Sequence, residues 1–349
     1  MRGGAAAVGS RDEPAVTPVT VSRWSRAASA FTGASLLAVA ALAVVPYVIG
    51  GPAEQPLITL FTFIAMASLW NLLAGFSGLT SFGQQAYIGV GAYALYLVAS
   101  RGINPFAGIA VAAVIAAAVG LPVSALVLRL SGGYFAVATL VVAATFQIVA
   151  TLSPSVGGTT GVSVPGLAGY GDVLREALTY WATLAVAVVS VAGIYLLVRR
   201  RFGLDARAVG SDPVGAASSG VRVGRIRLLA YLVAAGGAGA VGAVIALQTL
   251  YVEPTSVFSI QYSVDMLFMV LVGGMGTMEG PILGALVLFT LQETLSAYGA
   301  WYLVIVGGLA VAVTLAASRG IWGLASERLG WSLLPVGYRV RPPPGPPGP

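Results

Sequence analysis

Residues 228–250 read LLAYLVAAGGAGAVGAVIALQTL, a run of 23 positions without a charged side chain. A helix of this length covers about 35 Å, more than the ~30 Å hydrocarbon core of a bilayer. Similar runs recur along the chain, and only 9% of its 349 residues are charged, whereas soluble domains carry about 25%. The sequence therefore predicts an all-α integral membrane protein, a polytopic helical bundle, and argues against an unusually apolar soluble protein.

Ten apolar runs are predicted to span the membrane, and they form a transmembrane domain over residues 31–324. The spans are placed at 31–49, 57–74, 84–99, 105–128, 133–152, 179–198, 228–250, 262–273, 280–297 and 300–317. Residues 1–30 are predicted to be a polar tail. The first span is interpreted as a retained anchor, because no clear small-residue cleavage site follows it. The C-terminal segment 325–349 ends in PPPGPPGP, which cannot be helical and predicts a disordered tail.

The arginines predict the orientation. With the N-terminus inside, sixteen of the eighteen basic residues fall on the inner side, and only Arg101 and Arg175 fall outside. Loops rich in Arg stay in the cytoplasm, so we expect both termini and residues 199–227 there, in a bacterial plasma (inner) membrane. Because the net charge of +6 is spread along the chain, no nucleic-acid partner is predicted; the lipid bilayer is the expected surrounding.

Three residue types are missing, and their absence narrows the chemistry. The chain has no Cys, no His and no Lys. Zinc, haem and iron–sulfur sites built on thiolate or imidazole are excluded, and so is a phosphate-binding loop that ends in Gly-Lys-Ser/Thr. We expect no cofactor, no metal and no enzymatic activity, so that ATP-driven transport would need a separate ATPase. The GxGxxG pattern at 237–242 follows no strand and is interpreted as helix packing.

Two glycine-rich segments interrupt the apolar pattern, at NLLAGFSGLTSFGQQAYIGVGAYALYL (71–97) and VGGMGTMEGPILGA (272–285). Non-helical backbone at membrane depth is tolerated only where protein or a watery cavity covers it. Both are therefore predicted to be interrupted or re-entrant segments beside a translocation pathway, although tight helix packing explains single glycines equally well. The candidate pathway residues are Ser81, Gly83, Gln84, Gln85 and, as a neighbour, Glu293.

The largest loop between spans, RRRFGLDARAVGSDPVGAASSGVRVGRIR (199–227), contains a predicted short helix. Ser211 or Asp212 is expected to cap a helix that begins at Pro213 and stops at Gly220. A surface helix of small residues has little to hold it on its own protein. It suits insertion into a groove of another protein.

This loop resembles the coupling loop of ATP-binding-cassette importer permeases, through Ala216, Ala217 and Gly220, with Gly215 where the broader signature carries Glu. Six separated motifs between 57 and 324 resemble the branched-chain amino-acid importer permeases, and GGYFAVATL (132–140) and SRGIWGL (318–324) favour the LivM-type subunit. The resemblance implies alternating access in a complex with a sister permease subunit, two ABC ATPase subunits and an extracytoplasmic solute-binding protein. The coupling residues that it implies are Asp212, Pro213, Ala216, Ala217, Gly220, Arg222 and Arg225.

Three alternatives stay open at this point. An ion-coupled secondary transporter would need carboxylates at membrane depth, for which Asp265, Glu279 and Glu293 are candidates. Permeases of the same family also move urea or short amides. The external loop 153–178, which ends in a helix-like DVLREAL, would either cap an outer vestibule or serve as a connector.

Overall fold

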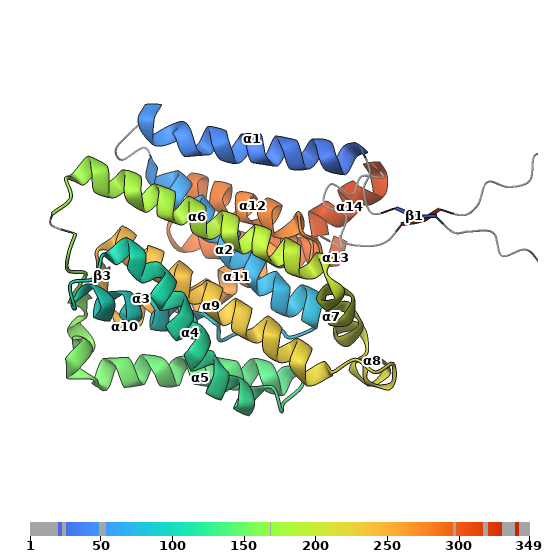
Figure 1. Cartoon of the computed structure of the whole chain (residues 1–349), viewed down its shortest axis with the longest axis horizontal. Helices are drawn as coiled ribbons and strands as arrows, with labels where there is room; N and C mark the ends of the chain where they lie inside the picture. Colours follow the sequence, from blue (N-terminus) through green and yellow to red (C-terminus); the bar gives the residue numbers. More distant parts are fainter. Residues whose placement is uncertain are drawn as a thin grey trace, which may run out of the picture.

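The computed structural model describes residues 20–22, 26–48, 54–167, 169–295, 298–316, 320–329 and 339–341. Most of the predicted tails 1–30 and 325–349 lies outside the described residues. The long helices lie side by side in one bundle, with α7, α8 and α14 at one end and α10 and β3 at the other (Figure 1). We call these the α8 end and the β3 end.

A helix occurs at each of the ten predicted spans, which confirms the polytopic all-α fold. The ten are α1 (Arg26–Val48), α2 (Gln55–Asn71), α3 (Gln84–Ala99), α4 (Pro105–Val127), α5 (Gly133–Leu152), α6 (Asp172–Arg199), α9 (Val223–Thr249), α11 (Gln261–Gly273), α12 (Gly280–Leu295) and α13 (Ala300–Ala316). Shorter helices are α7 (Arg201–Ser211), α8 (Pro213–Ser218), α10 (Pro254–Val257), α14 (Gly320–Leu329), the π-helical turn η2 (Leu72–Phe76), and the 3-10 turns η3 (Pro154–Val156) and η4 (Gly158–Thr160).

Length separates these helices into two groups. Among the described residues, seven helical stretches are long and apolar enough to cross a membrane, and they include Gln55–Phe76, Pro105–Val127 and Val223–Thr249. The part of α1 over Gly33–Val48 and the helix α12 are apolar but shorter. Helix α3 has only 16 residues, about 24 Å, because the glycine-rich segment before it is not helical.

Helices α2 and α9 form the centre of the bundle, and the same packing occurs twice around them. Helices α3 and α4 pack on α9, while α11 and α12 pack on α2. Small residues make the approach close: a β-carbon on Gly91 of α3 would collide with the carbonyl of Gly239, and one on Gly242 would collide with the carbonyl of Ile88. The glycines of the GxGxxG pattern are thus used for helix packing, as predicted.

Two short antiparallel strand pairs lie at opposite ends of the bundle. Strand β1 (Thr20–Ser22) pairs with β4 (Arg339–Arg341) beyond the α8 end (Figure 1). At the opposite end, β2 (Val162–Ser163) pairs with β3 (Tyr251–Val252). This second pair links the loop after α5 to the segment after α9.

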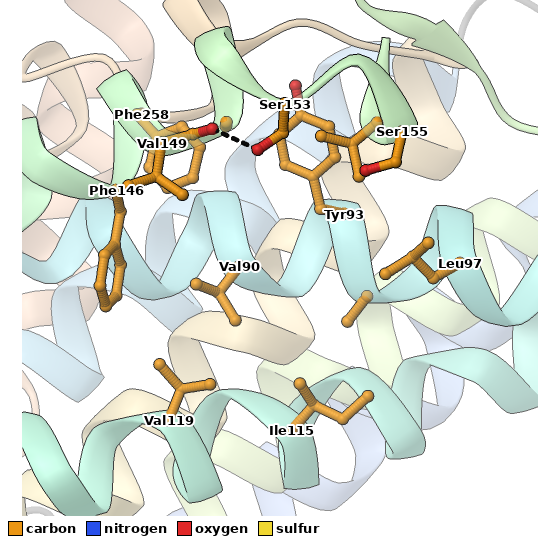
Figure 2. Close-up of a pocket in the computed structure, with 13 residues that line it drawn as sticks. Val90, Tyr93, Leu97, Ile115, Val119, Phe146, Val149, Ser153, Ser155 and Phe258 are labelled. Carbon is orange, nitrogen blue, oxygen red and sulfur yellow. Dashed lines mark hydrogen bonds between the residues drawn. The ribbon is translucent and has the colours of Figure 1, made fainter. Parts of the chain in front are cut away.

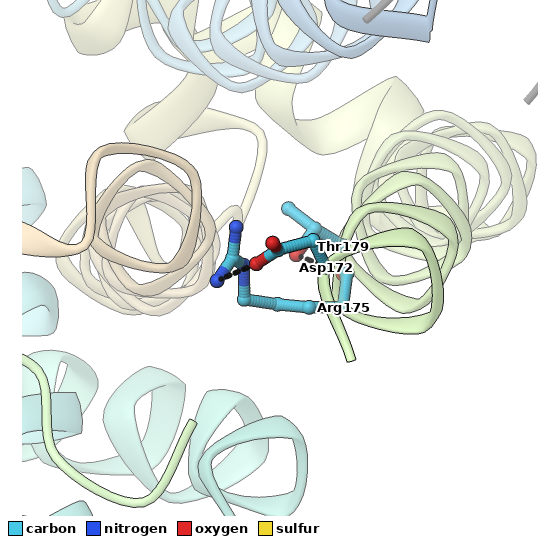
Figure 3. A network of polar contacts seen from close by, with 3 residues as sticks. All are labelled: Asp172, Arg175 and Thr179. Carbon is cyan, nitrogen blue, oxygen red and sulfur yellow. Dashed lines mark hydrogen bonds and ion pairs between the residues drawn. The ribbon is translucent and has the colours of Figure 1, made fainter. Parts of the chain in front are cut away.

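The DVLREAL segment, predicted to be helix-like, is continuous with span six, because α6 begins at Asp172, seven residues before the predicted span. The DVLREAL segment forms its first two turns. Asp172 in the first turn makes a 2.9 Å ion pair with Arg175, and the Thr179 hydroxyl donates to the Arg175 carbonyl at 2.8 Å (Figure 3). An acidic residue here also suits the positive end of the helix dipole. The loop is therefore shorter than its sequence indicated.

Candidate functional site

The predicted helix in the 199–227 loop is present as α8, Pro213–Ser218. Of the two proposed caps, Asp212 is the one used: its Oδ1 accepts from the Val214 N–H at 3.0 Å, whereas the Ser211 hydroxyl donates to the Arg207 carbonyl. Gly220 has φ +85°, and the Val221 N–H donates back to the Ala216 carbonyl at 3.0 Å. A left-handed glycine that closes such a turn is a common helix stop.

The two alanines of α8 face different ways. Ala216 is 5% exposed and packs against its own protein, while Ala217 is exposed and Val214 is 79% exposed. Of the two alanines that were expected to enter a partner's groove, only Ala217 is accessible for such a contact, because Ala216 packs against its own protein. Of the other predicted coupling residues, Pro213 is half-buried, and the exposed ones are Asp212, Gly220, Arg222 and Arg225.

Sequence reasoning missed α7, the helix that carries α8. Its buried side chains are Phe202, Ala206 and Val209, at the i, i+4, i+7 spacing of one helix face. That periodicity is visible in RFGLDARAVGS and could have predicted the helix. The Arg207 guanidinium lies 5.3 Å from the ring centre of Phe76. Burial lowers the pKa of Arg207 from its usual value, yet an arginine remains charged near neutral pH.

The first glycine-rich segment turns back into the bundle, as the prediction of an interrupted helix required. The Trp70 indole donates to the Ser81 carbonyl at 2.8 Å, and the Phe82 N–H donates to the Thr139 hydroxyl at 3.1 Å. Thr139 lies six residues into α5, about 9 Å from its start. Gly83 is pressed against the Thr139 carbonyl, where a β-carbon would collide. Helix α3 thus begins inside the bundle, between α2 and α5.

Two glutamines open α3 at this depth, and both are 1% exposed. The Gln85 side-chain oxygen accepts from the Ser263 hydroxyl of α11. The Gln84 side chain has neither donor nor acceptor partner among the described residues. The Ser81 hydroxyl, also buried, accepts from the Gly83 N–H at 3.2 Å. Glu293, by contrast, is exposed on α12, so the structure does not bring it into this buried cluster.

The second glycine-rich segment, between α11 and α12, meets the end of α2. The Asn71 side chain accepts from the Gly276 N–H at 2.8 Å and donates to the Thr277 carbonyl at 2.7 Å. Gly75 lies so close to Gly276 that a β-carbon on Gly75 would be 2.5 Å from the Gly276 nitrogen. The two interruptions are therefore joined at the α8 end of the bundle.

An apolar pocket of about 340 Å³ lies elsewhere, between α3, α4 and α5 (Figure 2). Its walls include Val90, Ile115 and Phe146, and the stacked rings of Tyr93 and Phe258 are 6.1 Å apart. None of the predicted pathway residues lines it. No sequence pattern predicted this pocket, because its lining residues are spaced like ordinary apolar helix faces.

A comparison with known families decides the class. Residues 54–316 match the family model described as the permease component of the branched-chain amino acid transport system. The chain belongs to this family. The match begins at the start of α2 and runs to the end of α13, so it covers both glycine-rich segments and the α7–α8 loop.

Curated relatives agree with the family. The chain is 27% identical over 286 residues to the high-affinity branched-chain amino acid transport system permease protein LivM of Escherichia coli K12, and to the protein of that name of Salmonella typhimurium LT2. Each alignment covers 74% of this chain and 67% of the relative. No solved structure matches.

Family membership makes the chain a permease component of a transport system. This argues against the alternative of an ion-coupled secondary transporter. A permease component acts in a system with other subunits, whereas a secondary transporter works alone. Asp265, the buried carboxylate of α11, accepts from the Gln261 amide at 2.7 Å and so has a local structural explanation.

Proposed function

We propose that this chain is the membrane-spanning permease subunit of an ATP-driven importer. Its partners would be a sister permease subunit, two ABC ATPase subunits, one of which docks on α8, and an extracytoplasmic solute-binding protein. The observation that carries this proposal is α8 itself: a capped helix of six residues that projects Ala217 and Val214 outward from the arginine-rich loop. The cap and the glycine stop fix the shape of this helix, so that a partner can bind it as a defined surface.

The α8 end is assigned to the cytoplasm. The arginine distribution supports this orientation, since sixteen of the eighteen basic residues lie in segments on that side. The pairing of β1 with β4 supports an even number of crossings, which would leave the segments before the first span and after the last span on one side. The protein would then be a multi-pass protein of a bacterial plasma membrane, with both termini inside.

The translocation pathway is assigned to the re-entrant segment with Ser81, Gly83, Gln84 and Gln85. A buried amide without partners costs about 1–3 kcal/mol, and such groups persist chiefly where function needs them. The Gln84 amide offers one donor site and one acceptor site to a zwitterionic solute that passes when the segment opens. Glu293 lies outside the closed cluster, and we assign it no contact with the solute in this state.

The proposed cargo is a branched-chain or related small amino acid. The names of the curated relatives support this class, and urea or a short amide is the alternative within the same family. A carboxamide side chain hydrogen-bonds all of these solutes, so the pathway residues do not discriminate among them. Competition of labelled leucine uptake by valine, isoleucine, urea and acetamide separates the two classes.

Copurification tests the proposal. The tagged chain, extracted from its native membrane in mild detergent, should bring down a second permease, an ATPase with a nucleotide-binding loop, and on addition of solute a periplasmic-type binding protein. Proteoliposomes with the chain alone and an imposed proton or sodium gradient should show no uptake. Gradient-driven uptake by the chain alone would contradict the proposal and restore the secondary transporter.

A further inference from the structure

Helix α7 leads into α8, the proposed coupling element, and it also contacts the segment before α3 that is proposed to line the pathway. Gly210 of α7 faces the turn after η2: a β-carbon at Gly210 would lie 2.9 Å from the Phe76 carbonyl oxygen, and one at Gly78 would lie 3.0 Å from Gly210 Cα. Gly78 has φ +67°, a conformation that glycine adopts at no steric cost. The two backbones are therefore in direct contact, without side chains between them.

We call the backbone contact between Gly78 and Gly210 the seam. A second contact lies beside it. The Arg207 guanidinium, one turn before Gly210 on α7, stacks over the Phe76 ring at 5.3 Å. A cation at this distance from an aromatic ring is attracted to the negative face of the ring. Phe76 closes the π-helical turn η2, and π-turns inside helices are frequent at functional sites and hinges. The seam thus joins α7 to a point where α2 is already irregular.

From the seam the chain reaches the pathway without another regular element. Gly78 to Gly83 contains no helix, and its backbone is held by the Trp70 and Thr139 contacts until Gln84 begins α3. Displacement of α7 would push Phe76 and Gly78, and this short segment would carry the movement to the unpartnered Gln84 amide.

We propose that the Gly78–Gly210 seam, with Arg207 on Phe76, transmits the ATPase-driven movement of α8 to the re-entrant segment and so opens the pathway. Gly78, Gly210 and Arg207 are positioning residues, since none of them touches the solute. The inference rests on the proposed function, because it needs an ATPase that moves α8. It adds the route that links docking to gating within this chain.

The test measures coupling, not activity alone. The complete complex, in proteoliposomes with the solute-binding protein, gives the ratio of labelled leucine transported to ATP hydrolysed. In Gly210→Ala the added methyl group presses on the Phe76 carbonyl, so we expect ATPase subunits to remain bound and ATP to be hydrolysed while the ratio falls at least fivefold. The matched control is Gly193→Ala in α6, where a β-carbon meets no atom within 4 Å; its ratio should stay within twofold of wild type.

The outcomes separate the two proposals. A wild-type complex that neither hydrolyses ATP nor imports leucine would defeat the proposed function. A working wild-type complex and an unchanged ratio in Gly210→Ala would overturn the inference alone. If Gly210→Ala does not assemble, Arg207→Leu replaces it, because this change removes the stacking on Phe76 and adds no atom to the glycine seam: a lowered ratio supports the inference, and a wild-type ratio overturns it.

Discussion

Ala217→Glu is the change that tests the docking role of α8 most directly. Ala217 is exposed at the outer face of a helix held by the Asp212 cap and by the buried Ala216, so a longer side chain there meets no atom of its own protein. Surface substitutions of this kind change the free energy of unfolding by less than about 0.5 kcal/mol. The membrane part should therefore insert and fold as in the wild type.

In the complex the expected cost is larger. Overfilling a close-packed contact costs about 1–3 kcal/mol, and burial of an unpaired carboxylate adds to it. Because 1.4 kcal/mol corresponds to a factor of ten in affinity, ATPase docking should weaken about tenfold or more. Pull-down of the ATPase subunits at matched permease expression and solute-stimulated ATP hydrolysis measure the two consequences.

Two neighbouring positions serve as controls. Ala208→Glu makes the same change at an exposed site of α7, away from the projecting face of α8, and should retain docking within about threefold. Ala216→Glu should instead lower the yield of folded permease, because that site is 5% exposed. If Ala217→Glu and Gly220→Val both dock and hydrolyse ATP at wild-type levels, α8 is not the coupling element and the reasoning fails.

Three further predictions concern orientation, pathway and packing. Ser219→Cys, exposed beside α8 in a chain without cysteine, should react with an impermeant thiol reagent only after the membrane is opened; labelling from outside intact cells would reverse the topology. Gln84→Leu should lower leucine uptake at least fivefold with the complex intact, whereas equal uptake would show that Gln84 only packs. Gly91→Leu should prevent stable assembly by forcing α3 from α9, while Gly193→Leu, with open space at its β-carbon, should purify normally; equal thermal stability of the two would contradict the packing account.

Local patterns in the sequence predict the helices and their ends, but they do not predict contacts between distant segments. The ten helices follow from uncharged runs, and the Asp212-Pro213 start and Gly220 stop of α8 follow from local capping chemistry. DVLREAL was recognised as helix-like but was not joined to span six, because its charges lower the hydropathy; its i, i+3 pair Asp172–Arg175 stabilises the helix.

The contacts between segments distant in the chain were beyond the sequence. Gln85 meets Ser263 across 178 positions, and Asn71 joins Gly276 across 205. No local pattern predicts such pairs, because they depend on how the helices are arranged. The same limit applies to the burial of two candidate site residues: burial of Ala216 depends on how α8 lies on its own protein, and exposure of Glu293 depends on which face of α12 is covered.

Replacement of Gln84 is expected to change thermal stability and transport in opposite directions. Replacing a buried, unpartnered amide by an apolar group of similar size removes a desolvation cost of about 1–3 kcal/mol, so Gln84→Leu should melt at or above the wild-type temperature while it transports less. If Gln84 only packed, the substitution would leave leucine uptake by the assembled complex unchanged. The same magnitude limits the affinity that a solute gains from this amide to roughly 5- to 150-fold. That gain is enough to favour passage and too small to trap the solute, as conduction requires.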